Sequence, residues 1–426
     1  MESLWQIKIC IMNAQAHFWS ATDVEINQAE SGKIEVIHLP TAKKFQITKG
    51  ISNLLEYLQT PRSFDEIKET LLPKFNEEDI LKTIKFLVNN HIVLTENEKG
   101  TYHIKKSNYT LFGFSEYEKN ASKTDSELVM VGIPFGYGNG TDTRCSWFPS
   151  NLRAFLKSKN VELNPKSGEI DYRFVSSLAN LAPLKKLIET KKIKDWGDLY
   201  IGSHEYPHVV YKKITNVASD LFNKEIKPFF IGGDHSITFP ILKGLDKSLG
   251  QAFQVIQFDA HTDTYKVGSQ GGNSTHHHGN FMTEAMKLPN LKKVVQLGIR
   301  GFSNYTKELT NHPKQQVFWA DEVKHKLANN QDFGIDSTLP TYVTFDIDFL
   351  DGVFAPGTAT PVYNGFSYNE TALLLEKILP PLNIIGFDLV EVNTKISPEI
   401  NTIEIASNLI LLLSNFAKIE PKSAKL

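Results

Sequence analysis

The sequence contains very little cysteine. Its 426 residues include only Cys10 and Cys145. Two cysteines cannot build a disulfide framework or a zinc site made of thiolates, so a hydrophobic core must hold the fold and any metal site must use other ligands. Hydrophobic residues make up 41% of the chain, which is enough for a large core.

A dominant charge, a long apolar run and a nucleotide-binding loop are also lacking. The formal net charge of −2 gives no general attraction to nucleic acid or to an anionic membrane. No apolar run approaches the roughly 20 residues that span a bilayer, and the beginning MESLWQIKIC does not resemble a signal peptide. No GxGxxG motif follows the first buried run, and there is no Walker loop. We therefore expect a cytoplasmic protein without nucleic-acid or membrane partners.

The composition changes along the chain and predicts two domains. Residues 106–125 are polar and rich in serine, lysine and asparagine, which is typical of a linker. We expect a first domain at 1–105 and a second at 126–426.

The first domain is predicted to be a small α+β module. The runs 32–40 and 43–50 are expected to pair as a hairpin. Apolar residues at helical spacing then predict three helices: one after residue 50, one opened by the capping box of Ser63 and Glu66, and one after Asn76. Strands followed by three short helices predict a winged-helix-like domain.

Such a module could bind DNA, a peptide or nothing. Residues 1–100 contain 11 Lys/Arg against 14 Asp/Glu, a net charge of −3, whereas a DNA-binding domain needs a basic surface. A peptide laid along an edge strand needs only main-chain hydrogen bonds and a few pockets. A structural appendage or an oligomerisation arm is the alternative.

Five buried runs separated by helical spacers characterise the second domain. They are PFFIGG, FQVIQFD, VVQLGIRG, TYVTFDID and NIIGFDLVEV. Continuous apolar runs of this length are typical of parallel strands covered on both faces. The order predicts an α/β domain with an open, mostly parallel sheet between helices, and functional groups at the carboxyl ends of the strands.

Ionisable residues follow three of these runs. They are His235; Asp259, His261 and Asp263; and Asp346 and Asp348. Alternate residues of a strand point to one side, so we expect these side chains to meet. Four carboxylates need a compensating cation, although any single aspartate here could be a cap or a turn former. Imidazole and carboxylate favour divalent metals such as Mn²⁺, and six ligands suit two ions better than one. Asp234 is interpreted as a turn residue.

These motifs resemble the metal-binding signatures of the ureohydrolases, the superfamily of arginase and agmatinase. The resemblance rests on GGDHS at 232–236, DAHTD at 259–263 and FDIDFLDGVFAPGTATP at 345–361, together with VGIPFG, DWGD at 195–198 and VEVN at 390–393. It covers roughly residues 127–415 and implies two Mn²⁺ ions per subunit, both bound by Asp259 and Asp346. His235 and Asp263 would complete one ion, and His261 and Asp348 the other.

The resemblance also implies catalytic roles. Glu391 corresponds to the family's guanidinium-binding glutamate, and a carboxylate matches that planar cation; an exposed glutamate at a strand end is the alternative. His278, in STHHHGN, corresponds to a histidine that transfers protons, although His276 and His277 compete for this role. Asp263 would also hydrogen-bond the hydroxide held by the metals.

Two substrate-binding positions differ from those of arginases. Tyr265 and Ser303 stand where arginases that act on free arginine carry polar groups for its ammonium and carboxylate. This difference argues against free arginine. Agmatine, a guanidino acid or an arginine side chain of a peptide all stay open.

The first domain resembles the PqqD-like precursor-recognition elements of peptide-modifying enzymes. With it, the whole chain resembles the peptide arginases, which convert arginine residues of a ribosomally made precursor peptide to ornithine and release urea. The implied partner is that precursor, with its leader bound by the first domain, and a homo-oligomer stays open. Alternatives are a small-molecule ureohydrolase (agmatinase, arginase or guanidino-acid hydrolase) with an accessory domain, and a non-catalytic leader-binding scaffold. A single-zinc deacetylase is disfavoured by the paired DxHxD and DxD motifs.

Overall fold

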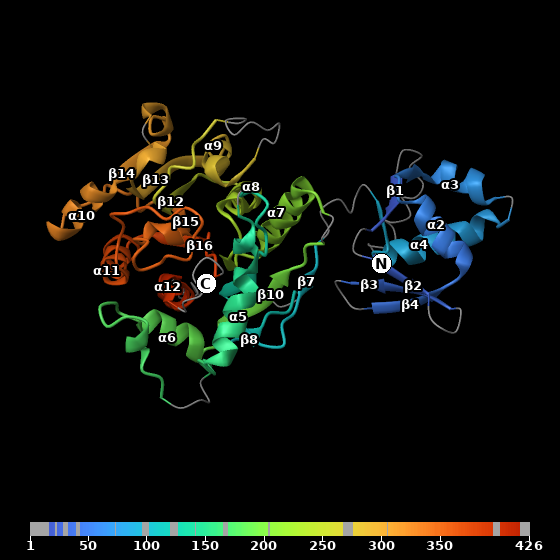
Figure 1. The fold of residues 1–426 in the computed structure, drawn as a ribbon, viewed down its shortest axis with the longest axis horizontal. Coiled ribbons are helices and arrows are strands. Elements are labelled where there is room, and N and C mark those ends of the chain that lie inside the picture. The colour runs from blue at the N-terminus through green and yellow to red at the C-terminus, as the bar shows by residue number, and fades with distance from the viewer. Residues whose placement is uncertain are drawn as a thin grey trace, which may run out of the picture. The chain divides into compact units, whose positions relative to one another are not determined.

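The computed structural model describes most of the chain. The described residues are 17–21, 24–28, 33–39, 43–72, 74–95, 102–119, 127–140, 142–164, 169–202, 205–266, 276–304, 306–394 and 401–417. The chain divides into two compact units, one of residues 1–105 with 200–213, and one of residues 106–199 with 214–426 (Figure 1). Residues 200–213, which the sequence places in the second domain, belong to the first unit. Among the described residues, no helix is both long and apolar enough to cross a membrane.

The first unit contains the three predicted helices, each with a side-chain cap. They are α2 (Lys49–Tyr57) after Thr48, α3 (Phe64–Leu71) with the predicted box of Ser63 and Glu66, and α4 (Glu77–Asn89) after Asn76. The caps accept hydrogen bonds from N–H groups that have no partner within the helix, which sets where each helix starts. The helices pack through fully buried residues such as Ile67, Ile84 and Leu87.

Two small antiparallel sheets complete the first unit. One has the order β2-β3-β4, from β2 (Val24–Gln28), β3 (Ile34–His38) and β4 (Lys43–Ile47). The other has the order β5-β1-β6, from β5 (Arg62–Ser63), β1 (His17–Ser20) and β6 (Val93–Thr95). The short strand β7 (Ile104–Lys105) belongs to neither of these two sheets. Pairing of β3 with β4 confirms the hairpin. The unit contains two three-stranded sheets, which is more β-structure than the single hairpin of the predicted winged-helix-like domain, so that arrangement is not shown.

The second unit is built on a sheet with the order β14-β13-β12-β15-β16-β11-β9-β10. Its strands are β9 (Leu128–Gly132), β10 (Ile193–Leu199), β11 (Lys227–Ile231), β12 (Phe253–Phe258), β13 (Leu291–Ile299), β14 (Gln315–Trp319), β15 (Pro340–Asp346) and β16 (Asn383–Val390), and β8 (Ser115–Glu116) pairs with β10. All neighbouring strands are parallel. The predicted α/β architecture with an open parallel sheet is confirmed.

Helices alternate with these strands and cover the sheet (Figure 1). They are α5 (Phe148–Ser158), α6 (Ala182–Glu189), α7 (Pro207–Asn223), α8 (Thr238–Leu249), α9 (Phe281–Ala285), α10 (Ala320–Ala328), α11 (Tyr368–Ile378) and α12 (Asn401–Ser414). Every residue of β12 and β15 is buried, as expected for parallel strands covered on both faces. A large hydrophobic cluster, which includes Phe258, Val343 and Phe387, supports the centre of the sheet.

Four central strands bring their carboxyl ends to one edge. Strands β12, β15, β16 and β11 are consecutive neighbours in the sheet. The chain leaves β11 through Gly232 and Gly233, whose φ angles of 82° and 87° suit glycine. A Cβ on Gly233 would lie 2.8 Å from the carbonyl oxygen of Phe135, which follows β9. The segments that leave β11 and β9 therefore approach as closely as a glycine allows. The residues that follow these four strands form the candidate site.

Candidate metal centre and active site

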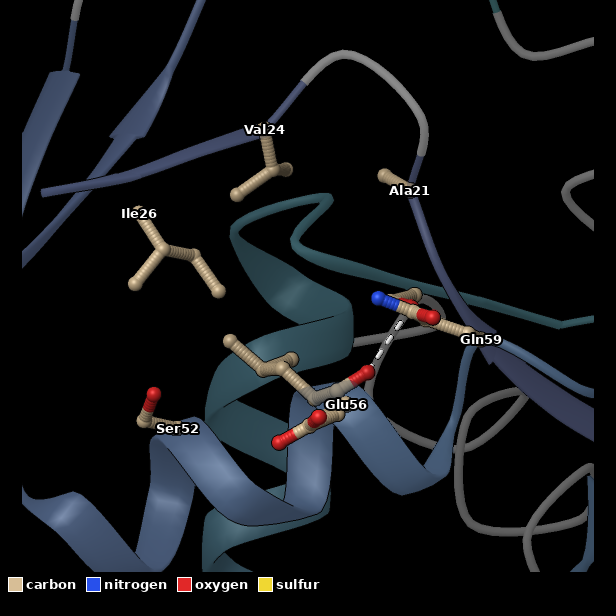
Figure 2. A pocket seen from close by; sticks show the side chains of 8 residues that line it. Ala21, Val24, Ile26, Ser52, Glu56 and Gln59 are labelled. Atoms are coloured by element: carbon tan, nitrogen blue, oxygen red, sulfur yellow. Dashed lines mark hydrogen bonds between the residues drawn. The ribbon is translucent and has the colours of Figure 1, made fainter.

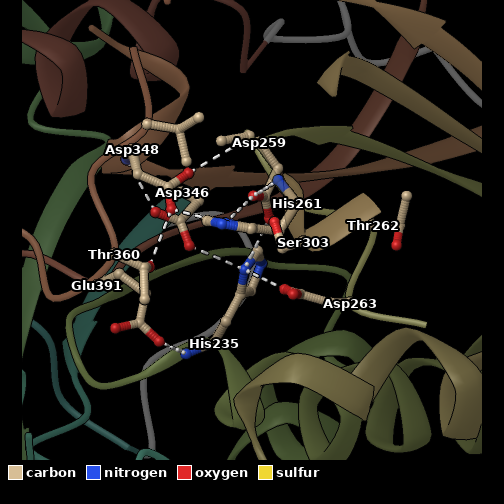
Figure 3. Close-up of polar contacts among 12 residues, drawn as sticks. His235, Asp259, His261, Thr262, Asp263, Ser303, Asp346, Asp348, Thr360 and Glu391 are labelled. Atoms are coloured by element: carbon tan, nitrogen blue, oxygen red, sulfur yellow. Dashed lines mark hydrogen bonds and ion pairs between the residues drawn. The ribbon is translucent and has the colours of Figure 1, made fainter. Parts of the chain in front are cut away.

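One group of side chains collects around His235 (Figure 3). Its Nδ1 lies 3.1 Å from Asp259 Oδ2, 3.1 Å from Asp263 Oδ2 and 3.2 Å from Asp346 Oδ2. The imidazole comes from the turn after β11, and the carboxylates come from the ends of β12 and β15. Three strand ends therefore meet at one buried point.

A second group lies beside the first. His261 Nδ1 is 2.9 Å from Asp348 Oδ2 and 3.6 Å from Asp259 Oδ1. Among the described residues, the sets that could hold a metal ion are His235, Asp259 and Asp346, and Asp259, His261 and Asp348; within each set the ligand atoms lie within 4.8 Å of one another. Asp259 belongs to both sets, one oxygen facing each imidazole. All six residues that the sequence singles out as ligands are thus brought together.

The electrostatics of this cluster match a site for cations. Burial raises the pKa of Asp346 well above its usual value, and the charges of Asp348 and Asp259 add to the shift. Burial and Asp259 raise the pKa of Asp263 to about 6. Burial opposes protonation of His235, but hydrogen bonds to the carboxylates raise its pKa well above the usual value. Buried carboxylates must be balanced by protons or by metal ions, and two imidazoles with four carboxylates form a donor set that fits two divalent cations.

A buried hydrogen-bond chain orients the first imidazole. His235 Nε2 lies 2.8 Å from Thr344 Oγ1, and the Thr344 hydroxyl donates to Asp388 Oδ1 at 2.6 Å. Asp388 also accepts hydrogen bonds from Tyr342 and Thr238. The chain keeps Nε2 occupied, so Nδ1 faces the carboxylates, an arrangement by which outer residues tune metal sites. Thr344 and Asp388 are not among the predicted site residues; their only signal in the sequence is a polar residue inside an apolar run.

Arg300 fixes the backbone around the second imidazole. It is buried, and its guanidinium donates to the carbonyl oxygens of Gly298, Asp348, Leu350, Val362 and Tyr363. The planar fork of an arginine carries five N–H donors, so it can reach more carbonyl oxygens at once than a lysine, which has three donors on one nitrogen. The side chain of Asp348 accepts a further hydrogen bond from the N–H of Ala260 at 3.1 Å. The loops after β13 and β15 are thereby held together.

Glu391 lies next to the cluster with one oxygen unused. Its Oε1 accepts a hydrogen bond from the N–H of His235 at 2.9 Å and lies 3.2 Å from His278 Nδ1. Its Oε2 is buried and has no hydrogen-bond partner among the described residues. Burial opposes ionisation, but the hydrogen bond with His278 lowers the pKa of Glu391 below its usual value. A buried carboxylate oxygen without a donor is suited to bind an added cation.

His278 is the member of the histidine run that contacts Glu391. Burial opposes its protonation, but Glu391 raises the pKa of His278 to about 9, so this ring can donate a proton at neutral pH. His276 Nε2 lies 2.9 Å from the carbonyl oxygen of Ser236, and burial lowers its pKa to about 4. His277 Nδ1 accepts a hydrogen bond from the N–H of Gly279. The geometry therefore favours His278 over its two neighbours for proton transfer.

Tyr265 and Ser303 contact each other. The Tyr265 hydroxyl donates to the carbonyl oxygen of Ser303 at 2.6 Å. The Tyr265 hydroxyl thus holds the loop that carries Ser303.

Asp234 accepts hydrogen bonds from the N–H groups of Gly138 and Asn139 at 2.7 and 3.1 Å, which confirms its interpretation as a turn residue.

Two ligand-bearing positions have unusual backbone conformations. Asp263 and Glu391 have φ angles of 52° and 61°, in the left-handed region that side chains other than glycine rarely adopt. Such conformations persist only where the surroundings enforce them, and they gather at functional sites.

Cys145 is buried near Glu391 and Asp234. Burial raises the pKa of its thiol well above the usual value, and the charges of Glu391 and Asp234 add to the shift, which argues against a thiolate nucleophile.

Comparisons with known proteins agree with this geometry. The sequence model of the Arginase family matches residues 126–414. A protein of Photorhabdus laumondii named agmatinase is 31% identical over 291 residues, which are 66% of this chain and 84% of that protein. The crystal structure of a hypothetical agmatinase from Burkholderia thailandensis has 27% identity and a TM-score of 0.56, covering 70% of this chain and 88% of that chain. Trypanosoma cruzi formiminoglutamase, solved with Mn²⁺, shares the fold at 19% identity and a TM-score of 0.56, covering 74% of this chain and 100% of that chain.

Proposed function

The chain belongs to the arginase family, and we propose that it converts arginine residues of a ribosomally made precursor peptide to ornithine with release of urea. The observation that carries the proposal is Glu391, whose buried Oε2 has no hydrogen-bond partner among the described residues and lies on the side chain that contacts His278. A guanidinium is the planar cation that a carboxylate binds best. Hydrolysis of a guanidinium also needs hydroxide and a proton donor.

Six residues would hold two metal ions. Asp259, which belongs to both candidate sets, would contact both ions, and the family resemblance gives Asp346 the same role. His235 and Asp263 would complete one ion, and His261 and Asp348 the other. When bound, such a pair of ions supplies hydroxide at neutral pH by lowering the pKa of a shared water. We propose Mn²⁺, because the imidazole and carboxylate donors suit it and the T. cruzi formiminoglutamase of the same fold was solved with Mn²⁺.

The remaining steps use residues of the chain itself. Glu391 would bind the guanidinium and turn its carbon toward the metal ligands, while Asp263 would accept a hydrogen bond from the hydroxide. His278, protonated at neutral pH, would give its proton to the leaving amine. Addition of water breaks the bond from the guanidinium carbon to the side-chain nitrogen, and leaves an ornithine ammonium and urea.

Two features support a peptide as the substrate. The Tyr265 hydroxyl donates its hydrogen bond to the Ser303 carbonyl oxygen. Neither side chain is charged, so this pair offers no charged group for the ammonium or carboxylate of free arginine. Among the described residues, the sheet β2-β3-β4 of the first unit ends in two edge strands, β2 and β4, and a peptide can add to such an edge. We propose that the first unit, which resembles PqqD-like elements, binds the leader.

A pocket beside one of these edges is suited to hold a side chain of such a peptide. It has a volume of about 540 Å³ and lies between β2 and α2 (Figure 2). Val24, Ile26 and Leu55 supply apolar surface, and Ser52, Glu56 and Gln59 supply polar groups. Apolar pockets with a few polar groups next to an edge strand are what β-strand addition requires.

A small guanidine such as agmatine is the second candidate substrate. The agmatinase of P. laumondii, of which this chain covers 84%, favours it. In that case the first unit would be an accessory domain.

Urea release tests the proposal. The Mn²⁺-loaded full chain is given free arginine, agmatine, an arginine-containing peptide with its leader, and the same peptide without the leader. We expect urea from the leader-bearing peptide, with loss of CH₂N₂ per converted arginine by mass spectrometry. Urea from agmatine and from neither peptide would overturn the peptide assignment and leave the ureohydrolase chemistry intact.

A further inference from the structure

Five large apolar side chains are exposed on loops of the second unit that also carry the candidate site. Their exposed fractions are 63% for Tyr137, 87% for Phe302, 83% for Val353, 45% for Phe354 and 72% for Tyr363. Single exposed apolar residues are ordinary, but several on loops at the carboxyl ends of the strands of one sheet indicate a binding surface. We call these five residues the apolar rim.

Tyr137 and Phe302 each precede a residue whose carbonyl oxygen accepts a hydrogen bond from a candidate site residue. The carbonyl oxygen of Gly138, which follows Tyr137, accepts the N–H of His278 at 3.1 Å. The carbonyl oxygen of Ser303, which follows Phe302, accepts the Tyr265 hydroxyl. Tyr137 follows β9 and Phe302 follows β13, so both lie at the carboxyl edge of the sheet, where the metal ligands gather.

Arg300 ties the loop that carries Tyr363 to a candidate metal ligand. Its Nη2 donates to the carbonyl oxygens of Asp348 at 2.6 Å and of Val362 at 3.1 Å, and its Nε donates to that of Tyr363 at 3.0 Å. A Cβ on Gly301 would lie 2.7 Å from Val362 Cγ1, so the loops that carry Phe302 and Tyr363 touch. These exposed side chains thus stand on loops that are fixed to the backbone of the site.

The loop after Asp348 is anchored in the same way. The carboxylate of Asp351 accepts hydrogen bonds from the N–H groups of Val353 and Gly365 at 3.0 and 2.8 Å. The exposed Val353 and Phe354 therefore belong to an ordered turn a few residues beyond the metal ligand.

We propose that the apolar rim binds the aromatic or aliphatic side chains that flank the reacting arginine of a peptide substrate. The inference rests on the proposed function and narrows its substrate to peptides with apolar residues beside the arginine. A second copy of the chain is a less suitable occupant, because the rim loops also hold Asp348, Ser303 and the backbone partner of His278. A copy covering the whole rim would cover the approach to these groups, whereas a peptide that delivers an arginine passes over the rim.

The test compares rim variants on matched substrates. Phe302→Ser, Tyr363→Ser and the double variant are assayed on two leader-bearing peptides that differ only in having leucine and phenylalanine, or serine, on either side of the arginine. Leu373→Ser is the control, since Leu373 is an exposed apolar residue within α11, outside the loops at strand ends. Agmatine serves as a substrate without flanking residues.

We expect the wild type to prefer the apolar-flanked peptide. The double variant should lower kcat/KM for that peptide by roughly 100-fold, mainly through KM, and should remove most of the preference, because contact with each of the two aromatic residues is worth about a factor of ten in binding. The Leu373→Ser control should match the wild type. Equal kcat/KM of the wild type for both peptides, or an equal loss on both in the variants, would overturn the inference.

The outcomes also separate this inference from the proposed function. Urea from agmatine but from no peptide refutes the peptide substrate, and the rim assignment with it. Peptide conversion that ignores the flanking residues refutes the rim assignment alone. Rim variants that change the sedimentation of the protein and leave the flank preference intact would assign the rim to contacts between copies and refute its role in substrate binding.

Discussion

His278 Nδ1 lies 3.2 Å from Glu391 Oε1, so the proton donor and the guanidinium-binding carboxylate of the proposed reaction are in direct contact. Each stabilises the charge of the other: the pKa of His278 is raised to about 9, and that of Glu391 is lowered. The contact uses one carboxylate oxygen and leaves Oε2 for a substrate cation.

Replacing Glu391 with glutamine should strongly reduce turnover without loss of metal. The variant keeps the shape of the side chain but loses the charge that orients the guanidinium, so we expect kcat/KM to fall roughly 10²–10³-fold. Because the carboxylate also raises the pKa of His278, that pKa should move back toward 6.5, which NMR titration of the ring can follow. Unchanged metal content with near-normal activity would contradict the role of Glu391.

Replacing Thr344 with valine should weaken metal binding. Valine has the same shape but cannot link His235 Nε2 to Asp388, so the ring loses its orientation. We expect Mn²⁺ affinity to fall about 10–100-fold in an equilibrium titration. Thr341→Val, on the same strand β15, is the control, since Thr341 bonds to Gln254 and Leu339. An equal effect of both substitutions would point to general damage to the strand.

Replacing Arg300 with lysine should destabilise the second unit. Lysine cannot span the five carbonyl oxygens that the guanidinium reaches, and unsatisfied buried carbonyls cost about 1–3 kcal/mol each. We expect a loss of about 2–4 kcal/mol in the free energy of unfolding, measured by denaturant titration. The exposed Arg173, which pairs with Asp171, provides the matched substitution Arg173→Lys, which should be nearly neutral.

The first unit should lose stability in mild acid because of His38. Burial lowers the pKa of His38 to about 4, with contributions from His91, Lys43 and Lys213. Between pH 6.5 and 4 the unfolded chain binds a proton at this position and the folded chain does not, so stability falls as the pH falls through this window. The loss from pH 6.5 to 5 should be about 1.5 kcal/mol.

Hydrogen exchange in α4 of the full chain can measure this pH effect on the first unit. His38→Leu should remove about 1.5 kcal/mol of the pH dependence. His17→Leu should leave it unchanged, since His17 is exposed in the same unit. An identical pH dependence in wild type and His38→Leu would show that His38 is not responsible.

The parts of the molecule that the sequence predicts are those with a regular pattern. Apolar runs mark the strands, and alternation places Asp259, His261 and Asp263 together after one of them. The second sheet of the first unit escapes prediction, because β5 and β6 have two or three residues each and pair with β1 across long stretches of chain. Strands this short show no periodicity.

Other features of the site depend on tertiary structure alone. The left-handed conformations of Asp263 and Glu391 follow from the surrounding loops, and no local residue type indicates them. Thr344 and Asp388 are polar residues within buried runs, and their partnership with His235 appears only when β15, β16 and the turn after β11 lie side by side. The contact of Tyr265 with Ser303 likewise joins loops that are distant in sequence.

The count of tightly bound metal ions per chain tests the central claim most directly. The full chain, loaded with Mn²⁺ and freed of excess metal, is compared with Asp259→Ala by elemental analysis, and exchange coupling between neighbouring ions is sought by electron paramagnetic resonance. Asp259 takes part in both candidate ligand sets. We predict two coupled ions per chain in the wild type, and loss of both metal and urea release in the variant. One isolated ion in the wild type, or full metal content in an active Asp259→Ala variant, would contradict the two-metal centre.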